Sequence, residues 1–267
     1  EVGADLAQAA PMLRLVQGDV GSGKTVVAAL AAAQAIEAGH QVAVMAPTEL
    51  LAEQHRRNFA QWFAPLDIEP VWLASKVKGR ARTKALAAIA DGTPLVIGTH
   101  ALMQESVGFA RLGLAIVDEQ HRFGVHQRLA LRDKGGGLVP HQLVMTATPI
   151  PRTLAMAAYA DLDVSVIDEL PPGRTPVTTV AVPAARREEV VARIHAACAD
   201  GRQAYWVCTL IEESELLAAQ AAEQVHQQLT AALPDLRVGL IHGRLKPAEK
   251  EAVMAAFKSG DLEVLVA

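Results

Sequence analysis

The feature that most constrains this chain is a glycine-rich segment set between an apolar run and an alanine-rich stretch. Residues 18–25 read Gly-Asp-Val-Gly-Ser-Gly-Lys-Thr and match the pattern G-x-x-x-x-G-K-[ST] throughout. Residues 12–16 have the apolar character of a buried strand, and residues 26–38 have the composition of a helix. A strand, a glycine-rich turn and a helix in this order predict a backbone cradle for phosphates, since glycine allows close approach and a helix N-terminus favours anions.

This cradle predicts ATP and Mg²⁺ as ligands. We expect Lys24 to reach the β- and γ-phosphates and the Thr25 hydroxyl to ligate Mg²⁺. The expected nucleotide-binding residues are Gly18, Asp19, Val20, Gly21, Ser22, Gly23, Lys24 and Thr25. The alternative is a glycine-rich turn without a ligand, which the flanking strand and helix disfavour.

A second signal is an acidic pair that follows an apolar run. Residues 114–117 are apolar, and Asp118 and Glu119 come directly after them, where ligands of open α/β sheets bind. We expect Asp118 to hold Mg²⁺ and Glu119 to orient and deprotonate the attacking water. A glutamate in this role indicates hydrolysis of the γ-phosphate rather than its transfer to a metabolite. An ordinary acidic strand end is the alternative.

Hydroxyl and histidine side chains follow three further apolar runs. Thr146 and Thr148 can hydrogen-bond the acidic pair. A change at the two carboxylates could then be transmitted across the cleft through these hydroxyls. Thr48, Thr99 and His100 could hold a phosphate backbone without much positive charge. Each also has a structural interpretation, since Thr48 can cap a helix.

The pattern along the chain predicts an α/β protein with mainly parallel sheets. Short apolar runs alternate with amphipathic stretches, as in βαβ units whose sheet is covered on both faces. Expected strands are 13–16, 41–46, 70–73, 95–98, 114–118, 142–146 and 164–168, with helices near 25–38, 49–63, 79–90, 126–132 and 151–159.

Three prolines and a glycine near residues 171–176 predict a linker. We therefore expect a first domain over 1–170 and a second over 177–267. In the second domain, strands are expected near 177–182, 204–210, 237–241 and 263–267, with helices near 186–199, 214–231 and 247–258. Because the chain ends in an apolar strand, we expect the second domain to be incomplete.

Charge and cysteine usage limit the partners. A net charge of −4 gives no overall attraction to nucleic acid, so such a partner has to be argued from local sites. No stretch approaches the ~20 apolar residues of a membrane span. The two cysteines suit a reducing, cytoplasmic compartment rather than a disulfide framework.

Together these motifs resemble the motor of superfamily 2 helicases, and in particular the RecG branch-migration helicases of bacteria. The resemblance covers essentially the whole chain. It rests on residues 17–25, 46–55, 98–102, 118–125, 146–154 and 168–174, and on 205–208, 211–214 and 242–244 in the second domain. It implies two RecA-like domains, the second truncated, in a monomer that uses ATP to remodel branched or double-stranded DNA.

The resemblance also implies roles for individual residues. Gln120 and His121 would act with the catalytic residues Lys24, Asp118 and Glu119. They would also couple the state of the bound nucleotide to the strength of DNA binding. Thr48, Thr99, His100 and Arg244 would line the DNA path. The family's wedge domain, adenine-reading motif and later arginines fall outside these residues. We therefore expect residues 1–267 alone to bind nucleotide weakly and to hydrolyse it slowly.

Three alternatives stay open. A translocase of the transcription–repair coupling factor is similar, but it usually has Asp-Glu-Glu-His where this chain has residues 118–121 as Asp-Glu-Gln-His. A small-molecule kinase could use the same glycine-rich loop. A nucleotide-binding module with little activity of its own is the third.

Overall fold

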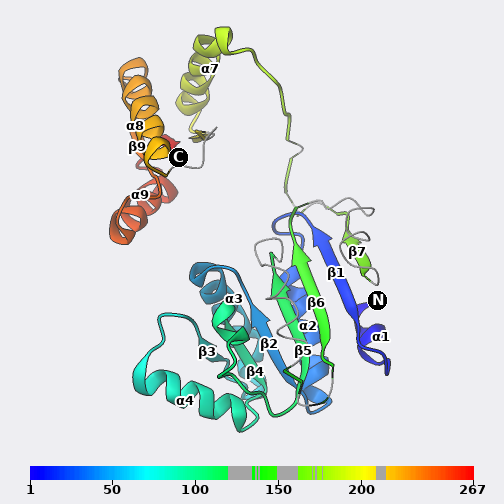
Figure 1. Ribbon diagram of the computed structural model, residues 1–267. Coiled ribbons are helices and arrows are strands. Elements are labelled where there is room, and N and C mark those ends of the chain that lie inside the picture. Colours follow the sequence, from blue (N-terminus) through cyan, green and yellow to red (C-terminus); the bar gives the residue numbers. More distant parts are fainter. Residues whose placement is uncertain are drawn as a thin grey trace. The chain divides into compact units, whose positions relative to one another are not determined.

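A proline-rich segment at 171–176 separates two structural units, Glu1–Thr175 and Pro176–Ala267. The computed structural model describes residues 1–119, 134–135, 137, 139–148, 162–169, 171, 173–175, 177–208 and 215–267. Each unit has its own parallel sheet and its own core. Figure 1 shows the strands of the first unit's sheet side by side. The expected α/β class with mainly parallel sheets is therefore confirmed. The expected helices near 126–132 and 151–159 lie outside the described residues.

Within the described residues, the first unit contains one sheet of seven parallel strands in the order β3-β4-β2-β5-β6-β1-β7. The strands are β1 (Leu13–Gly18), β2 (Gln41–Met45), β3 (Val71–Leu73), β4 (Leu95–Gly98), β5 (Leu112–Asp118), β6 (His141–Thr146) and β7 (Asp163–Ile167). The helices are α1 (Val2–Leu6), α2 (Lys24–Glu37), α3 (Glu49–Phe63) and α4 (Gly79–Ala90). Because all strands are parallel, their carboxyl ends lie at one edge of the sheet.

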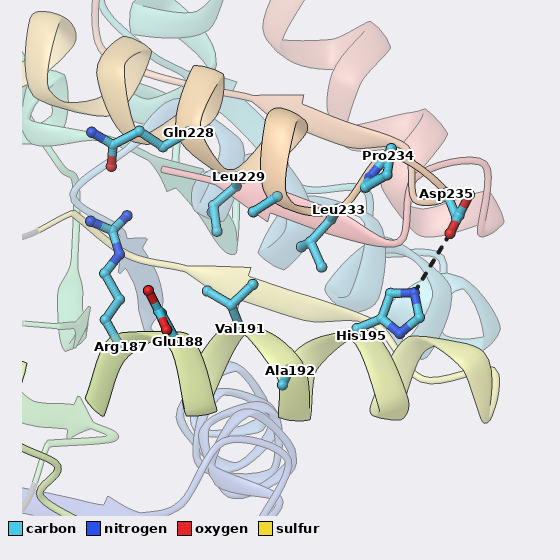
Figure 2. Close-up of a pocket in the computed structure, with 11 residues that line it drawn as sticks. Arg187, Glu188, Val191, Ala192, His195, Gln228, Leu229, Leu233, Pro234 and Asp235 are labelled. Atoms are coloured by element: carbon cyan, nitrogen blue, oxygen red, sulfur yellow. Dashed lines mark ion pairs between the residues drawn. The ribbon is translucent and has the colours of Figure 1, made fainter. Parts of the chain in front are cut away.

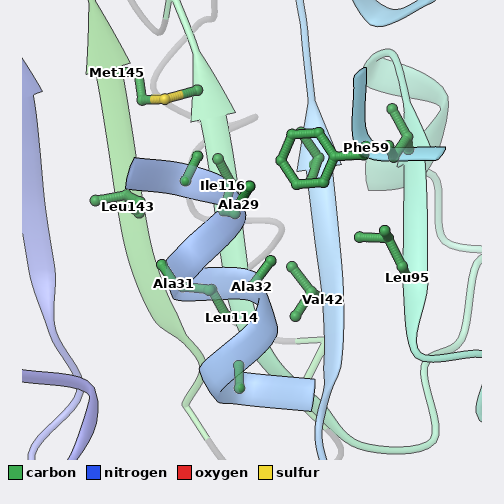
Figure 3. Packing of buried hydrophobic residues seen from close by; sticks show 14 of the residues in the cluster. Ala29, Ala31, Ala32, Val42, Phe59, Leu95, Leu114, Ile116, Leu143 and Met145 are labelled. Atoms are coloured by element: carbon green, nitrogen blue, oxygen red, sulfur yellow. The ribbon is translucent and has the colours of Figure 1, made fainter. Parts of the chain in front are cut away.

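Two apolar layers cover the faces of this sheet. Alternate residues of a strand point to opposite faces, so Val44 packs in one layer and its neighbours Ala43 and Met45 in the other. One layer joins the strands to α2 and α3, and the other joins them to α4 and the segment that follows β4. Figure 3 shows the alanines of α2 lying against strand residues such as Leu114 and Leu143. Small side chains let this helix pack close to the sheet.

The second unit contains a three-stranded parallel sheet in the order β8-β10-β9 within the described residues. Its elements are α7 (Arg187–Ala199), β8 (Ala204–Trp206), α8 (Glu215–Ala232), β9 (Val238–Leu240), α9 (Pro247–Ser259) and β10 (Val264–Val266). Val264 and Val266 are fully buried against Cys198 of α7 and Leu229 of α8. Figure 2 shows a hollow between α7 and α8, bordered at one end by His195 and Asp235.

The prediction of a strand over 177–182 is wrong. Residues 177–182, all of which the structure describes, do not form a strand. Val177 and Val180 are 79% and 67% exposed. A strand needs a partner for its backbone groups, and an apolar pattern alone does not supply one. In the parts of the chain that are described, no helix combines the length and apolar character needed to cross a bilayer.

Candidate active site

The carboxyl ends of β1, β6 and β5 bring the two strongest sequence signals together. Residues 18–25 begin at the last residue of β1, Asp118 ends β5, and β6 lies between these two strands. A hollow of about 270 Å³ at this edge is lined by Lys24, Thr25, Asp118 and Glu119, among others. This volume is slightly below the roughly 300–1,000 Å³ of typical ligand pockets. The glycine-rich loop and the acidic pair therefore share one site.

The loop has the conformation that a phosphate cradle requires. Gly21 and Gly23 have φ values of 85° and 98°, which side chains rarely adopt, and Gly23 directly precedes α2. Ser22 Oγ is buried and has no hydrogen-bond partner among the described residues. A phosphate oxygen would satisfy this hydroxyl, so the loop fits the triphosphate that its sequence predicts.

Lys24 folds back onto its own loop. Its Nζ donates hydrogen bonds to the carbonyl oxygens of Gly18 and Asp19 at 2.7 and 2.8 Å. These acceptors are neutral, and a hydrogen bond between an ammonium and a phosphate is stronger because both partners are charged. A bound phosphate can therefore replace the two carbonyl oxygens as the hydrogen-bond partner of Lys24 Nζ.

Glu119 is held in place by its neighbours on β6. Its backbone N–H donates to the Met145 carbonyl at 2.9 Å, and its carboxylate accepts from Thr146 Oγ1 at 3.0 Å and from the Ala147 N–H at 3.2 Å. Thr146 Oγ1 in turn accepts from the Thr148 N–H at 3.1 Å. Thr146 thus contacts the acidic pair through its side chain, whereas Thr148 joins this network through its backbone.

Asp118 has a partner that the sequence reasoning missed. Its Oδ2 lies 2.7 Å from Nε2 of His55, a buried residue of α3. A histidine at 55 falls on the same helix face as Ala52 and Phe59, and this spacing was the available signal that it points toward the sheet. The spacing alone does not identify the carboxylate that it meets.

A second missed residue is Arg174, at the end of the first unit. Its Nη1 lies 2.8 Å from Asp19 Oδ2 and donates to the Val20 carbonyl at 3.1 Å. A side chain added at Gly21 would also meet Pro171, at 3.3 Å. The segment predicted as a linker therefore contacts the glycine-rich loop.

The candidate metal ligands are few. Thr25 and Asp118 both line the hollow, and no cluster of three or more His, Cys, Asp or Glu residues is found within the described ranges. Mg²⁺ commonly binds through one or two protein ligands, substrate phosphates and water. The donor set is therefore suited to Mg²⁺ held with a nucleotide.

Three of the four residues expected along a DNA path follow β2 and β4, at the same edge of the first unit's sheet. Thr48 is exposed after β2 and caps α3, accepting from the Leu51 N–H at 3.3 Å. After β4, His100 is exposed and lies 3.2 Å from Ser75 Oγ, but Thr99 is only 1% exposed. Arg244 is exposed in the second unit, after β9. Gln120 and His121 lie outside the described residues.

Comparisons with known proteins agree with this geometry. The family model described as DEAD/DEAH box helicase matches residues 6–157. Over 271 aligned positions, the chain is 68% identical to the ATP-dependent DNA helicase RecG of Escherichia coli K12, covering all of this chain and 39% of that relative. It is 45% identical to RecG of Aquifex aeolicus, covering 99% and 34%. The chain thus spans well under half the length of these relatives.

Solved structures show the same similarity. A structure of RecG bound to a three-way DNA junction matches with a TM-score of 0.76 and 41% identity, covering the whole chain and 34% of that protein. The DNA-bound helicase MrfA matches with a TM-score of 0.69 at 17% identity, which indicates a shared fold. The resemblance to RecG expected from the sequence is confirmed, and so is the RecA-like helicase fold.

Proposed function

Because this chain belongs to the DEAD/DEAH box helicase family, we propose that it is the ATP-driven motor of a helicase that remodels branched DNA. The observation that carries this proposal is the shared hollow lined by Lys24, Thr25, Asp118 and Glu119. The RecG relatives and the RecG structure with a three-way junction support the choice of branched DNA. We further propose that the motor acts as a monomer in the bacterial cytoplasm.

The chain's own residues supply distinct parts of ATP hydrolysis. Residues 18–25 bind the phosphates through backbone N–H groups, and Lys24 exchanges its two carbonyl partners for phosphate oxygens. Thr25 and Asp118 hold Mg²⁺, which when bound neutralises charge on the transferred phosphate. Glu119 orients the attacking water and accepts its proton.

Hydrolysis would be coupled to DNA through the neighbouring strand ends. Thr146 contacts Glu119 directly, and Thr148 hydrogen-bonds Thr146, so the state of the acidic pair can reach the loop after β6. Gln120 and His121 are proposed to act beside them. Thr48, His100 and Arg244 are exposed and would contact the phosphate backbone, while the buried Thr99 would act by shaping the loop before His100.

The test is ATP hydrolysis by the full-length protein with and without a forked DNA. We expect DNA to raise the rate severalfold and Lys24→Ala to abolish both hydrolysis and nucleotide binding. Lys258→Ala, which removes an exposed lysine of α9, is the matched control and should leave the rate unchanged.

Other outcomes point to other functions. Equal rates with and without DNA would contradict a DNA motor and favour a simple nucleotide-binding module. Equal stimulation by linear duplex and forked DNA would favour a duplex translocase of the transcription–repair coupling type. Phosphate transfer to a metabolite would indicate a kinase.

A further inference from the structure

Helix α3 links two neighbouring strand ends of the first unit. It is the first helix after β2, from which residues 46–48 separate it, and β2 is hydrogen-bonded to β5 in the sheet. Its buried face carries Ala52, His55, Phe59 and Phe63, all packed toward the sheet. His55 is six residues beyond Glu49, the first residue of the helix, or about one and two-thirds turns, at the level where β5 ends in Asp118.

The contact between His55 and Asp118 is short and shielded from water. Nε2 and Oδ2 are 2.7 Å apart, and the two side chains are only 8% and 14% exposed. A carboxylate oxygen can only accept a hydrogen bond, so the proton lies on Nε2 of His55. The other ring nitrogen, Nδ1, is buried without a hydrogen-bond partner among the described residues. Phe59 packs edge-on against the ring, with 6.4 Å between the ring centroids, and Asp118 holds the ring through the hydrogen bond from Nε2.

We propose that His55 is a positioning residue for the Mg²⁺ site, holding Asp118 in the rotamer that binds the metal. The hydrogen bond engages Oδ2 and leaves Oδ1, which would coordinate the metal or accept a hydrogen bond from a metal-bound water. Partners that orient a ligating group commonly change metal affinity by about 10- to 100-fold when they are removed. This inference rests on the proposed function, since Mg²⁺ enters the site with a nucleotide.

The test measures the Mg²⁺ requirement for nucleotide binding, which does not depend on turnover. The full-length protein is mixed with the fluorescent nucleotide methylanthraniloyl-ADP and titrated with Mg²⁺. His55→Leu keeps the size of the side chain but removes the donor, while His55→Gln places an amide N–H where Nε2 was. We expect His55→Leu to raise the Mg²⁺ concentration for half-maximal binding about 10-fold. We expect His55→Gln to stay close to the natural protein.

Two controls separate positioning from packing. Phe63→Leu changes the same buried face about two turns beyond His55, and should leave the Mg²⁺ requirement unchanged. Binding in EDTA should be the same for all variants. Thermal unfolding shows whether His55→Leu is folded. If it is not, His55→Asn replaces it, because the shorter amide side chain of asparagine cannot reach Asp118.

The proposal is overturned if His55→Leu, or the substitute His55→Asn, keeps the natural Mg²⁺ requirement. It is also overturned if His55→Gln or Phe63→Leu shifts the requirement as far as His55→Leu does. Failure of the proposed function has a different signature. In that case the natural protein and Lys24→Ala would behave alike, with no Mg²⁺-dependent nucleotide binding in either.

Discussion

At the scale of single residues, Glu119 is held in a backbone conformation that side chains rarely adopt. Its φ is 51°, and the left-handed region costs a non-glycine residue about 1–2 kcal/mol. The hydrogen bonds from Thr146 and Ala147 to its carboxylate hold it there. A glycine would fit this backbone without strain, so we infer that the carboxylate is kept for its chemistry.

The first prediction follows from that role. Glu119→Gln keeps the size of the side chain and one oxygen that can accept from the Ala147 N–H, but removes the base. We expect nucleotide binding to be retained and ATP hydrolysis to fall by about 10²- to 10⁴-fold. Phosphate release and methylanthraniloyl-ADP binding measure the two effects separately. Glu105→Gln, at an exposed acid, serves as the control, and a loss of only a few-fold in Glu119→Gln would contradict the assignment.

A second residue-scale prediction concerns pH and His141, at the start of β6. Burial lowers the pKa of His141, the nearby His40 lowers it further, and Asp5 partly opposes this. Its Nδ1 accepts a hydrogen bond from the Met12 N–H at 2.9 Å, which requires an unprotonated nitrogen. In the unfolded chain the ring binds its proton near pH 6.5. Stability from the neutral ring is therefore present above about pH 6.5 and is lost as pH falls through the lower pKa of the folded state.

His141→Asn tests this linkage, because its amide oxygen can replace Nδ1 as the acceptor without titrating. The free energy of unfolding, measured by urea titration between pH 7.5 and pH 5, should fall less steeply with acid in the variant than in the natural chain. Parallel pH curves for the two proteins would show that His141 does not contribute.

At the scale of elements, the sequence predicts most of the first unit closely. The apolar runs at 41–46 and 95–98 coincide with β2 and β4, because strands buried on both faces need continuous apolar residues. The segment 177–182 has a similar composition but is not a strand, since strand formation depends on a partner that local sequence does not specify. Helix α1, only five residues long, has too short a pattern to detect.

In the site, too, local sequence predicts some residues and not others. Lys24, Thr25, Asp118 and Glu119 were predictable because motif spacing and strand ends define them locally. His55 and Arg174 were not assigned roles, because their contacts join residues 63 and 154 positions apart in the chain. Such contacts depend on the strand order, which composition and periodicity do not determine.

The start of α3 gives a prediction at this scale, since Thr48 caps the helix and is also proposed to contact DNA. Thr48→Ala removes the cap and should lower the free energy of unfolding by about 1 kcal/mol. Thr48→Asp keeps a good cap but adds a negative charge. We expect it to retain stability while weakening binding to forked DNA severalfold, as measured by fluorescence anisotropy. Unchanged DNA affinity in Thr48→Asp would leave capping as the only role of Thr48.

At the scale of the whole molecule, the two units have separate cores. The apolar layers of the first unit and the cluster around Val264 and Val266 in the second are built from different elements. Each unit also contains tryptophan, two in the first unit and one in the second. Trp72 lies 5.6 Å from the Arg56 guanidinium in the first unit, and Trp206 lies 5.1 Å from that of Arg187 in the second. Fluorescence can therefore follow the two units independently.

We expect residues 1–267 to unfold in two transitions, only one of which responds to nucleotide. Of the three tryptophans, Trp62 and Trp72 report the first unit and Trp206 the second, so Trp206→Phe and the double variant Trp62→Phe/Trp72→Phe isolate the two signals. MgADP at 100 times its dissociation constant should stabilise the unit that binds it by about 2.7 kcal/mol. Because the glycine-rich loop and the acidic pair both belong to the first unit, urea unfolding should shift in the Trp206→Phe protein and stay unchanged in the double variant. An equal shift in both proteins would mean that the two units unfold as one cooperative block.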